Sequence, residues 1–567
     1  MNKGLYLSVL CMTTAVYLLA DGTYSTAMAQ NFAPTTADPG VLIRELEDNR
    51  RGANILDDSV ILPEYQDPQL DLSDEKVLDF QGITLEGSTV YTEESLAPLY
   101  NDYLGQAVSF ADLHVIAQRI TRQYREDGFI FSRVILPPQS IQDGFVKMQA
   151  IEGQLTDVQI VGEYQDNTGL IASMADKIRG AGGPANSRDI ERYLLLIDDL
   201  PGITARSIVR PSEERAGGEL IITIEENAFE GSIGFDNRGS RYVGPYRATI
   251  VGAFNSLFGL HDRTTVRGIA ATEIEELRYI DITHEQQIGT EGMRFTGRAA
   301  LTRTEPGGNI ETLDIEGDSE LLDLEVRYPI MRSRRSNLNV YAGFGALNSE
   351  TDILGGAVET NDRVRNLRIG ADYDFIDPWG INRVDLFVTQ GLQFLGSTDD
   401  GAGRSRVNAD HGFTRLNASA SRVQDIFGSV SALISATGQL SNDPLLSSEE
   451  FSVGGPSFGR AYDAGEISGD RGWAGQVELR YSGVFNEMPV IQDYQAYSFI
   501  DYGRISNIDP TVGESDEESL TSYGAGVRFN MDYDMYSNFE VAVPMTDDVA
   551  AEGDDDIRFF FNILKRF

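Results

Sequence analysis

The sequence predicts a transmembrane β-barrel of about 16 antiparallel strands, preceded by two small α/β domains. Three observations support this fold class. The N-terminus has the pattern of an export signal, apolar and polar residues alternate from about Phe229 to the end, and the last residue, Phe567, is aromatic. Each observation is taken up below in chain order.

Residues 1–29 have the pattern of a signal peptide. Lys3 precedes an apolar run from Leu5 to Ala20, and the triplet Ala27-Met28-Ala29 supplies small residues at the positions that a signal peptidase requires. We expect cleavage after this triplet, with a short membrane anchor as the alternative. Cys11, the single cysteine, lies inside the signal, so the mature chain has no cysteine for a disulfide.

Net charge and motif content exclude several classes of function. The formal net charge is −42, whereas a nucleic-acid-binding protein presents a basic surface. His284-Glu285 begins like a zinc-protease motif but lacks the second histidine, and no Walker loop or Gly-x-Ser-x-Gly elbow occurs. We therefore predict no enzyme, no metal and no cofactor, and leave an enzymatic barrel such as a surface protease or lipase as an alternative.

The first segments after the signal are a short helix and a linker. Pro39 is well placed to begin a helix that ends near Arg50, with Val41, Leu42 and Leu46 on one face. Residues 51–76 are rich in Asp and Pro and show no periodicity, which is typical of a linker.

Two small domains follow, over residues 77–153 and 154–226. Both segments repeat the order strand, helix, helix, strand, strand. In the first we expect a weak helix over 93–103 and a stronger one after Ser109, which is a good N-cap. Each domain is too small to be an enzyme with an obvious cleft.

Residues 227–567 show the alternation of a membrane barrel. Val477, Leu479 and Tyr481, for example, alternate with polar residues, and acidic or Gly-rich turns separate such runs. A soluble β-sandwich has a similar alternation and is the alternative on this pattern alone. The last strand ends in Phe567 and would be an exposed aromatic edge in a soluble protein, which favours the membrane barrel.

Two segments of the barrel region depart from strand and turn patterns. The first is a long irregular loop, residues 454–472, in which Arg460 stands among small residues. The second is a strand in which Phe499, Asp501 and Gly503 share one face, so that Asp501 points into the lumen. A loop folded into the pore would bring the arginine to the carboxylate; a solvated acid and an unrelated surface loop are the alternative.

Short motifs occur in a specific order along the chain. The first domain carries Tyr124-Arg125-Glu126-Asp127-Gly128-Phe129 and, later, Glu152-Gly153; residues 194–202 read Leu-Leu-Leu-Ile-Asp-Asp-Leu-Pro-Gly; and the barrel begins with Asp236-Asn237-Arg238-Gly239-Ser240. In this order and spacing they resemble the hemolysin or filamentous-hemagglutinin secretion-activation family, the transporters of two-partner secretion. The resemblance covers nearly all of the mature chain.

This resemblance implies roles for the segments described above. Residues 77–153 and 154–226 resemble the family's polypeptide-transport-associated (POTRA) domains, and the helix within 38–50 stands where the family has a helix that plugs the pore. Gly459-Arg460-Ala461-Tyr462 stands where the family has Val-Arg-Gly-Tyr at the tip of a pore loop, and Phe499-x-Asp501-x-Gly503 matches the family's strand motif. The family pattern implies a contact between Arg460 and Asp501. Gly459 and Ala461 depart from that pattern, which bears on the geometry of the loop tip.

The resemblance implies an outer-membrane pore that recognises an unfolded exoprotein in the periplasm and exports it by two-partner (type V) secretion. The implied partners are an adhesin or hemolysin-like exoprotein with an N-terminal secretion signal, outer-membrane lipid, and the barrel-assembly machinery acting through Phe567. The alternatives are a barrel-insertion factor of the same superfamily and a passive porin.

Overall fold

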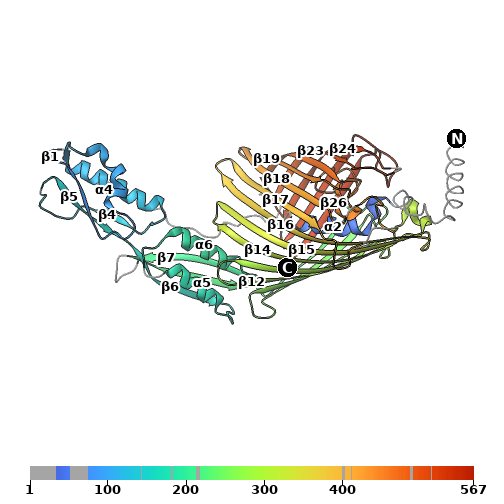
Figure 1. Ribbon diagram of the computed structural model, residues 1–567, viewed down its shortest axis with the longest axis horizontal. Helices are drawn as coiled ribbons and strands as arrows, with labels where there is room; N and C mark the ends of the chain where they lie inside the picture. The colour runs from blue at the N-terminus through green and yellow to red at the C-terminus, as the bar shows by residue number, and fades with distance from the viewer. Residues whose placement is uncertain are drawn as a thin grey trace.

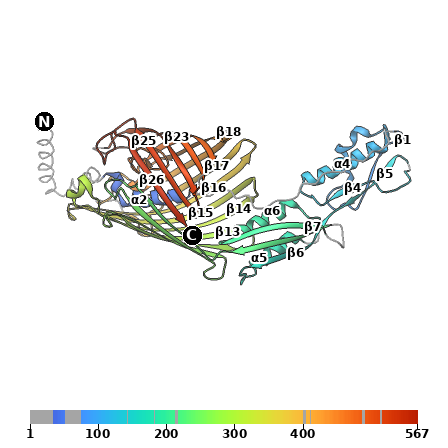
Figure 2. The ribbon, with the colours of Figure 1, turned by 180° about the vertical axis from the view of Figure 1, so that it is seen from behind.

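The computed structural model describes residues 34–51, 75–141, 143–180, 183–211, 217–398, 403–409, 411–485, 490–511 and 514–567. The expected signal peptide and most of the expected linker lie outside these residues. Figures 1 and 2 show two small domains that extend in a row from one end of a barrel, the first domain farthest from it.

The first small domain packs one long helix on a three-stranded sheet of order β2-β5-β4. Helix α4 begins after Ser109, whose hydroxyl accepts a hydrogen bond from Asp112 N while the Asp112 carboxylate accepts one from Ser109 N. Its buried face, which includes Ile116, Ile120 and Tyr124, covers the sheet. The elements are β1 (Lys76–Asp79), β2 (Gly82–Glu86), α3 (Glu93–Leu96), β3 (Ala107–Ser109), α4 (Phe110–Glu126), β4 (Arg133–Ile135) and β5 (Phe145–Ile151).

The helix expected over 93–103 is wrong in its length. Helix α3 ends at Leu96, and two 3₁₀ turns, Ala97–Leu99 and Asn101–Tyr103, follow it. Pro98 lacks an N–H and cannot donate the i→i−4 hydrogen bond that would continue the α-helix, while Ala97 N already bonds in the 3₁₀ manner to Glu94 O, so the chain goes on as short 3₁₀ turns.

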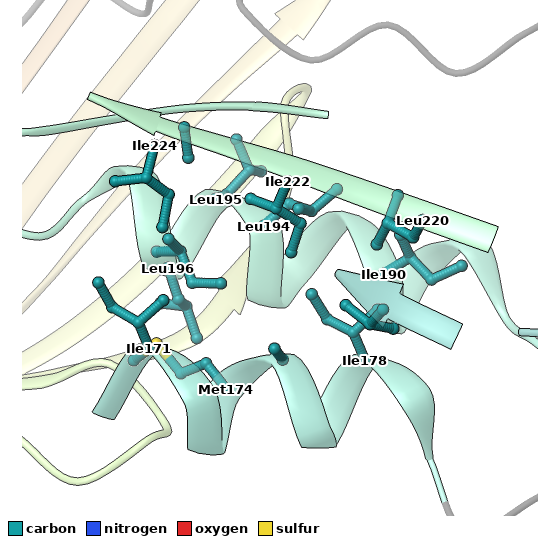
Figure 3. Close-up of a cluster of buried hydrophobic side chains, with 14 of the residues drawn as sticks. Ile171, Met174, Ile178, Ile190, Leu194, Leu195, Leu196, Leu220, Ile222 and Ile224 are labelled. Atoms are coloured by element: carbon teal, nitrogen blue, oxygen red, sulfur yellow. The ribbon is translucent and has the colours of Figure 1, made fainter. Parts of the chain in front are cut away.

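The second small domain repeats the arrangement with two helices on the sheet β6-β8-β7. Figure 3 shows side chains of both helices, such as Met174 and Leu194, pointing toward those of strand β8, such as Ile222. The two small domains touch through the backbone, because Ser187 N donates to Gly128 O at 2.8 Å. The elements are β6 (Gln154–Glu163), α5 (Leu170–Arg179), α6 (Ser187–Asp198), β7 (Ile203–Pro211) and β8 (Gly217–Glu226).

The remaining strands form a closed antiparallel barrel of 16 strands, which confirms the predicted fold class. Strand β26 pairs with β9, and Phe567 N and O both bond to the backbone of Gly231. The strands are β9 (Phe229–Asp236), β10 (Arg247–Asn255), β11 (Asp262–Ala271), β12 (Arg278–Ile288), β13 (Met293–Thr304), β14 (Glu316–Arg332), β15 (Ser336–Ile353), β16 (Val358–Asp377), β17 (Gly380–Gly391), β18 (Thr414–Phe427), β19 (Val430–Ser441), β22 (Arg471–Val484), β23 (Ile491–Ser506), β24 (Glu517–Met531), β25 (Met535–Pro544) and β26 (Arg558–Arg566).

The two faces of the barrel differ as the alternation predicts. Large apolar side chains such as Ile369, Leu386 and Ile500 are exposed on the outer face, where lipid replaces water. Their strand neighbours on the other face are polar and buried, as Asp501 illustrates. Strand pairing is nearly continuous around the wall, with single bulges in a few strand pairs, so the backbone of the spanning part is hydrogen-bonded within the sheet.

Helix α2 (Pro39–Arg51) lies among the barrel strands (Figures 1 and 2). The Asp38 carboxylate accepts hydrogen bonds from Gly40 N at 2.7 Å and Val41 N at 3.3 Å, which caps the first turn. The helix buries Leu42, Ile43 and Leu46 against an apolar patch that barrel strands and their connecting loops form together, made by Ile269, Ala271, Leu277, Tyr279, Ala300, Leu321, Leu347, Val364, Ala409, Phe413, Leu445 and Leu446. None of the helices in the described ranges combines the length and apolar character needed to cross a membrane.

Candidate functional site

The irregular segment singled out in the sequence is a hairpin-based loop that folds into the barrel. Residues 442–470 connect β19 to β22, and within them β20 (Phe451–Val453) pairs antiparallel with β21 (Ile467–Gly469). The tip of this pore loop contains Arg460, Ala461 and Tyr462, all of them buried.

Arg460 forms a network with two carboxylates of the inner wall. Its Nε and Nη2 donate to Asp501 Oδ2 and Oδ1 at 3.0 and 2.9 Å, and its backbone N donates to Asp501 Oδ2 at 3.1 Å. Its Nη1 donates to Glu478 Oε2 at 2.6 Å. Asp501 is fully buried and Glu478 nearly so. The bidentate contact with Asp501 fixes both the position and the plane of the guanidinium.

The other residues of the strand motif let the loop approach the wall. The Arg460 guanidinium lies over the Phe499 ring, 3.5 Å from its centre, a cation–π contact. Gly503 faces strand β20, and a Cβ there would lie 2.3 Å from Val453 Cγ1. Glycine at this position therefore permits the close packing of the pore loop on β23.

The loop tip accommodates both departures from the family pattern. Ala461 keeps a negative φ, so no glycine is needed there, whereas Gly459 has a φ of 80°. A Cβ on Gly459 would also lie 2.6 Å from Leu520 Cδ1, which excludes a valine in this backbone conformation. The residue with left-handed backbone at the loop tip is therefore Gly459, immediately before Arg460.

Tyr462 anchors the other side of the tip. Its hydroxyl accepts hydrogen bonds from the backbone N atoms of Met545, Thr546 and Asp547 at 3.2–3.4 Å. These residues belong to the connection between β25 and β26, so the tip is tied to both β23 and the last turn of the barrel.

The structure adds charged residues that the sequence reasoning missed. Glu478 also accepts from Arg528 and Arg480, while Arg238 donates both to Glu540 at 2.5 Å and to the carbonyl of Arg460 at 3.1 Å. Alternation had placed Glu478 on the polar face of its strand. Its partnership with Arg460 depends on the pairing register of β22 and β23, which sets Gln476 opposite Asp501, and a single sequence gives no register across strands.

The buried ion pairs of Arg460 with Asp501 and Glu478 fix the position of the pore loop. A buried arginine with two buried carboxylates loses solvation, and only good hydrogen-bond geometry offsets that loss. Removing one member of such a group typically costs about 3–5 kcal/mol because its partners stay charged and buried. The arrangement can hold a loop in one place inside the barrel. Within the described residues no cluster of three or more His, Cys, Asp or Glu side chains is arranged to hold a metal ion.

Helix α2 contacts the base of the same loop. Arg44 Nη2 lies 2.7 Å from Glu449 Oε1, and Glu449 also pairs with Arg415 on β18 at 2.8 Å. The Glu449 side chain is fully buried. On the opposite side of the helix, Arg267 Nη1 donates to Leu46 O at 3.2 Å. The helix and the pore loop therefore share a buried carboxylate.

Comparison with known proteins agrees with this architecture. The profile of the family described as "Haemolysin secretion/activation protein ShlB/FhaC/HecB" matches residues 220–529. The chain belongs to this family. The profile described as "POTRA domain, ShlB-type" matches residues 78–153. Among the relatives of this chain is the heme/hemopexin transporter protein HuxB of Haemophilus influenzae (strain 86-028NP), 24% identical over 490 residues, 84% of this chain and 85% of the relative.

Two matches to CdiB extend the comparison to a solved structure. The outer membrane transporter CdiB of Escherichia coli O6:K15:H31 (strain 536 / UPEC) is 24% identical over 473 residues, 81% of this chain and 78% of that protein. The structure of CdiB from Escherichia coli aligns with a TM-score of 0.76 at 20% identity, over 93% of this chain and 99% of the other. This member of the family accordingly has its barrel in the outer membrane and its POTRA domains in the periplasm.

Proposed function

We propose that this chain exports an unfolded exoprotein from the periplasm to the cell surface by two-partner secretion. The membership of the haemolysin secretion/activation family carries the proposal, and its matched region includes nearly the whole barrel. That membership favours a secretion transporter over a barrel-insertion factor or a passive porin. Export is the work of a transporter, and the site described above holds no arrangement for catalysis.

We assign different roles to the two elements that obstruct the barrel, helix α2 and the pore loop. Helix α2 is the plug of the resting channel, because it occupies the lumen and rests on an apolar patch that a solvated channel would leave wet. The pore loop is the fixed part, because Arg460 is tied to Asp501 and Glu478 by short, buried hydrogen bonds. Cargo then passes where the helix was, along a loop that stays in place.

The partners follow from the same proposal. The cargo is a secreted adhesin or hemolysin-like protein whose N-terminal secretion signal binds the periplasmic POTRA domains. The barrel-assembly machinery is proposed to read the last strand, which presents Phe559, Phe561 and Phe567 on the outer face. Folding of the cargo outside the cell supplies the directional free energy.

The test begins with a search of the neighbouring genes for a large β-helical exoprotein, and measures the secretion of that exoprotein when it is co-expressed with variants of the transporter. Arg460→Ala leaves Asp501 and Glu478 charged and buried, at a cost of about 3–5 kcal/mol to the docked loop. We expect at least a tenfold loss of exoprotein on the cell surface. Unchanged heat-modifiable mobility on gels checks that the barrel still inserts and folds.

The matched control is Arg480→Ala. Arg480 also contacts Glu478, at 2.7 Å, but lies outside the pore loop and is not bonded to Asp501. We expect that variant to retain most of the secretion. Normal secretion by Arg460→Ala, or equal loss in both variants, contradicts the assigned role of the loop.

A further inference from the structure

Two arginines project from the outer face of β16 at the height where the membrane ends. The outward residues of this strand from Leu367 to Phe375 are apolar or aromatic, namely Leu367, Ile369, Ala371, Tyr373 and Phe375. This run has the length of about 9–11 residues that a strand needs to cross the hydrocarbon. Arg365 and Arg363 are the next two outward residues on the extracellular side, so they lie at the level of the lipid headgroups.

Among the residues that the structure describes, neither arginine has an anionic partner. Arg365 donates only to neutral oxygens, among them Asn348 Oδ1 at 2.8 Å and Leu395 O at 3.2 Å. Arg363 Nε donates to Asn361 Oδ1 at 3.2 Å, and its side chain is exposed. Over the described parts of the chain, no carboxylate lies within the 4.0 Å of an ion pair to either guanidinium.

Two other outward arginines near the extracellular ends of their strands are compensated, whereas Arg471 on β22 donates to a neutral oxygen, Ser441 O, at 2.6 Å. Arg303 on β13 lies 3.2 Å from Glu316 and 3.5 Å from Glu305, and Arg504 on β23 contacts Glu517. Arg363 and Arg365 therefore place two like charges on one strand face, two residues apart, in a chain whose net charge is −42. Their mutual repulsion is relieved when an anion binds both.

The neighbouring loop places apolar side chains beside this pair. Leu392 N donates to Arg365 O at 2.7 Å and Thr398 N donates to Arg363 O at 3.0 Å, so the start of the connection between β17 and β18 is bonded to the edge of β16. Within this segment Phe394 and Leu395 are 57% and 62% exposed. A ligand that carries both a phosphate and acyl chains would cover both kinds of surface.

We propose that Arg363 and Arg365, with Phe394 and Leu395, bind the phosphate of an acylated, phosphorylated glycolipid of the outer leaflet. The guanidinium forks suit phosphate oxygens geometrically, and charge-assisted hydrogen bonds at a headgroup level are stronger than in bulk water. The site depends on the outer-membrane location and is independent of the secretion mechanism.

The experiment measures binding of bisphosphorylated lipid A to the full-length protein in phosphatidylcholine nanodiscs. We expect the double substitution Arg363→Ala/Arg365→Ala to weaken binding at least tenfold, and Arg363→Lys/Arg365→Lys to weaken it less, because lysine keeps the charge but loses the fork. Arg303→Ala, at a compensated arginine, is the matched control and should leave affinity within twofold. Heat-modifiable mobility verifies that each variant is folded.

Two further measurements distinguish binding of a lipid-linked phosphate from binding of free phosphate. Dephosphorylated lipid A should bind at least tenfold more weakly than the bisphosphorylated form to the unmodified protein. Phe394→Ser/Leu395→Ser should weaken lipid A binding but not the weak binding of inorganic phosphate. Equal affinity of the unmodified and double-alanine proteins, an equal loss with Arg303→Ala, or displacement of lipid A by equimolar inorganic phosphate would each overturn the proposal.

Discussion

At the scale of single residues, a buried carboxylate organises the pore loop and a half-buried one, Glu152, organises the first periplasmic domain. Glu152 in the first POTRA domain accepts hydrogen bonds from Thr89 N at 2.8 Å, Val90 N at 3.1 Å and Tyr124 OH at 2.9 Å. Burial raises the pKa of Glu152, but these hydrogen bonds outweigh it and hold the pKa below its usual value. The motif residues Tyr124 and Glu152 are therefore structural partners that fix the turn after β2.

We predict that Glu152→Gln loosens this turn in a pH-dependent manner. A folded-state pKa below the unfolded value gives stability that is present above the unfolded pKa, near 4.5, and is lost as the pH falls through the folded pKa. At neutral pH the variant should lose about 1–3 kcal/mol locally. Hydrogen exchange of the Thr89 and Val90 amides in the full-length protein measures this. The effect should shrink below pH 4, whereas Glu86→Gln, at an exposed pair with Lys147, should change little at any pH.

The sequence predicts some residues of the pore site and not others, for one physical reason. Alternation assigns Asp501 and Glu478 to the polar face of their strands, because side-chain direction depends only on the chain itself. Their meeting with Arg460 depends on register and on the path of a long loop, which are set by contacts distant in sequence. The family pattern supplied the pair of Arg460 and Asp501, and Arg238 belongs to the motif at the start of the barrel, but nothing local in the sequence indicates the contacts that Arg238, Arg528 and Glu540 make.

At the scale of elements, helix α2 is held in the barrel by one apolar face and a few polar contacts. Its apolar periodicity and the start at Pro39 were predictable from sequence. Its place inside the barrel was not, because an amphipathic helix of this length packs equally well on the surface of a soluble domain. The ion pair of Arg44 with Glu449 links the helix to the pore loop.

We predict that Arg44→Ala destabilises the plugged state. Of the two arginines paired with Glu449, Arg415 then remains, and the helix loses its ion pair with the loop while its apolar packing on Leu445 and Leu446 stays. Planar-bilayer recordings should show more frequent large-conductance openings, and deletion of residues 38–50 should make the large conductance permanent. Arg415→Ala removes the other cation from the same carboxylate but leaves the helix bonded, so it should open the channel less. A deletion variant that conducts like the intact protein contradicts the assignment of α2 as the plug.

At the scale of the whole molecule, the second POTRA domain is fastened to the rim of the barrel. Asp199, after α6, accepts two hydrogen bonds of 2.7 Å from Arg332 at the end of β14. Tyr193 donates to Glu291 in the turn after β12 at 3.0 Å, and burial together with that carboxylate raises the pKa of Tyr193 to about 12. The periplasmic arm thus has a defined direction relative to the pore.

We predict that exchanging the charges of Asp199 and Arg332 restores the orientation of the periplasmic arm that each single substitution disturbs. Asp199→Arg and Arg332→Asp each place like charges in contact and should broaden the distance distribution between spin labels on α5 and on a barrel turn. The double variant should narrow the distribution again and recover most of the secretion. Single variants with an unchanged distance distribution would show that this ion pair does not set the orientation of the arm.

The wall of the barrel is not of uniform height. Strands β14, β15 and β16 have 17, 18 and 20 residues, whereas β9 has 8. Since about 9–11 residues cross the hydrocarbon, the three long strands stand clear of the membrane on the extracellular side, and the opposite side of the mouth ends near the lipid surface. The mouth is therefore oblique. An exported polypeptide that leaves the mouth has the tall β-sheet of these strands on one side and water on the other. The first part of that polypeptide to fold therefore folds beside a fixed β-surface and not in isotropic solution.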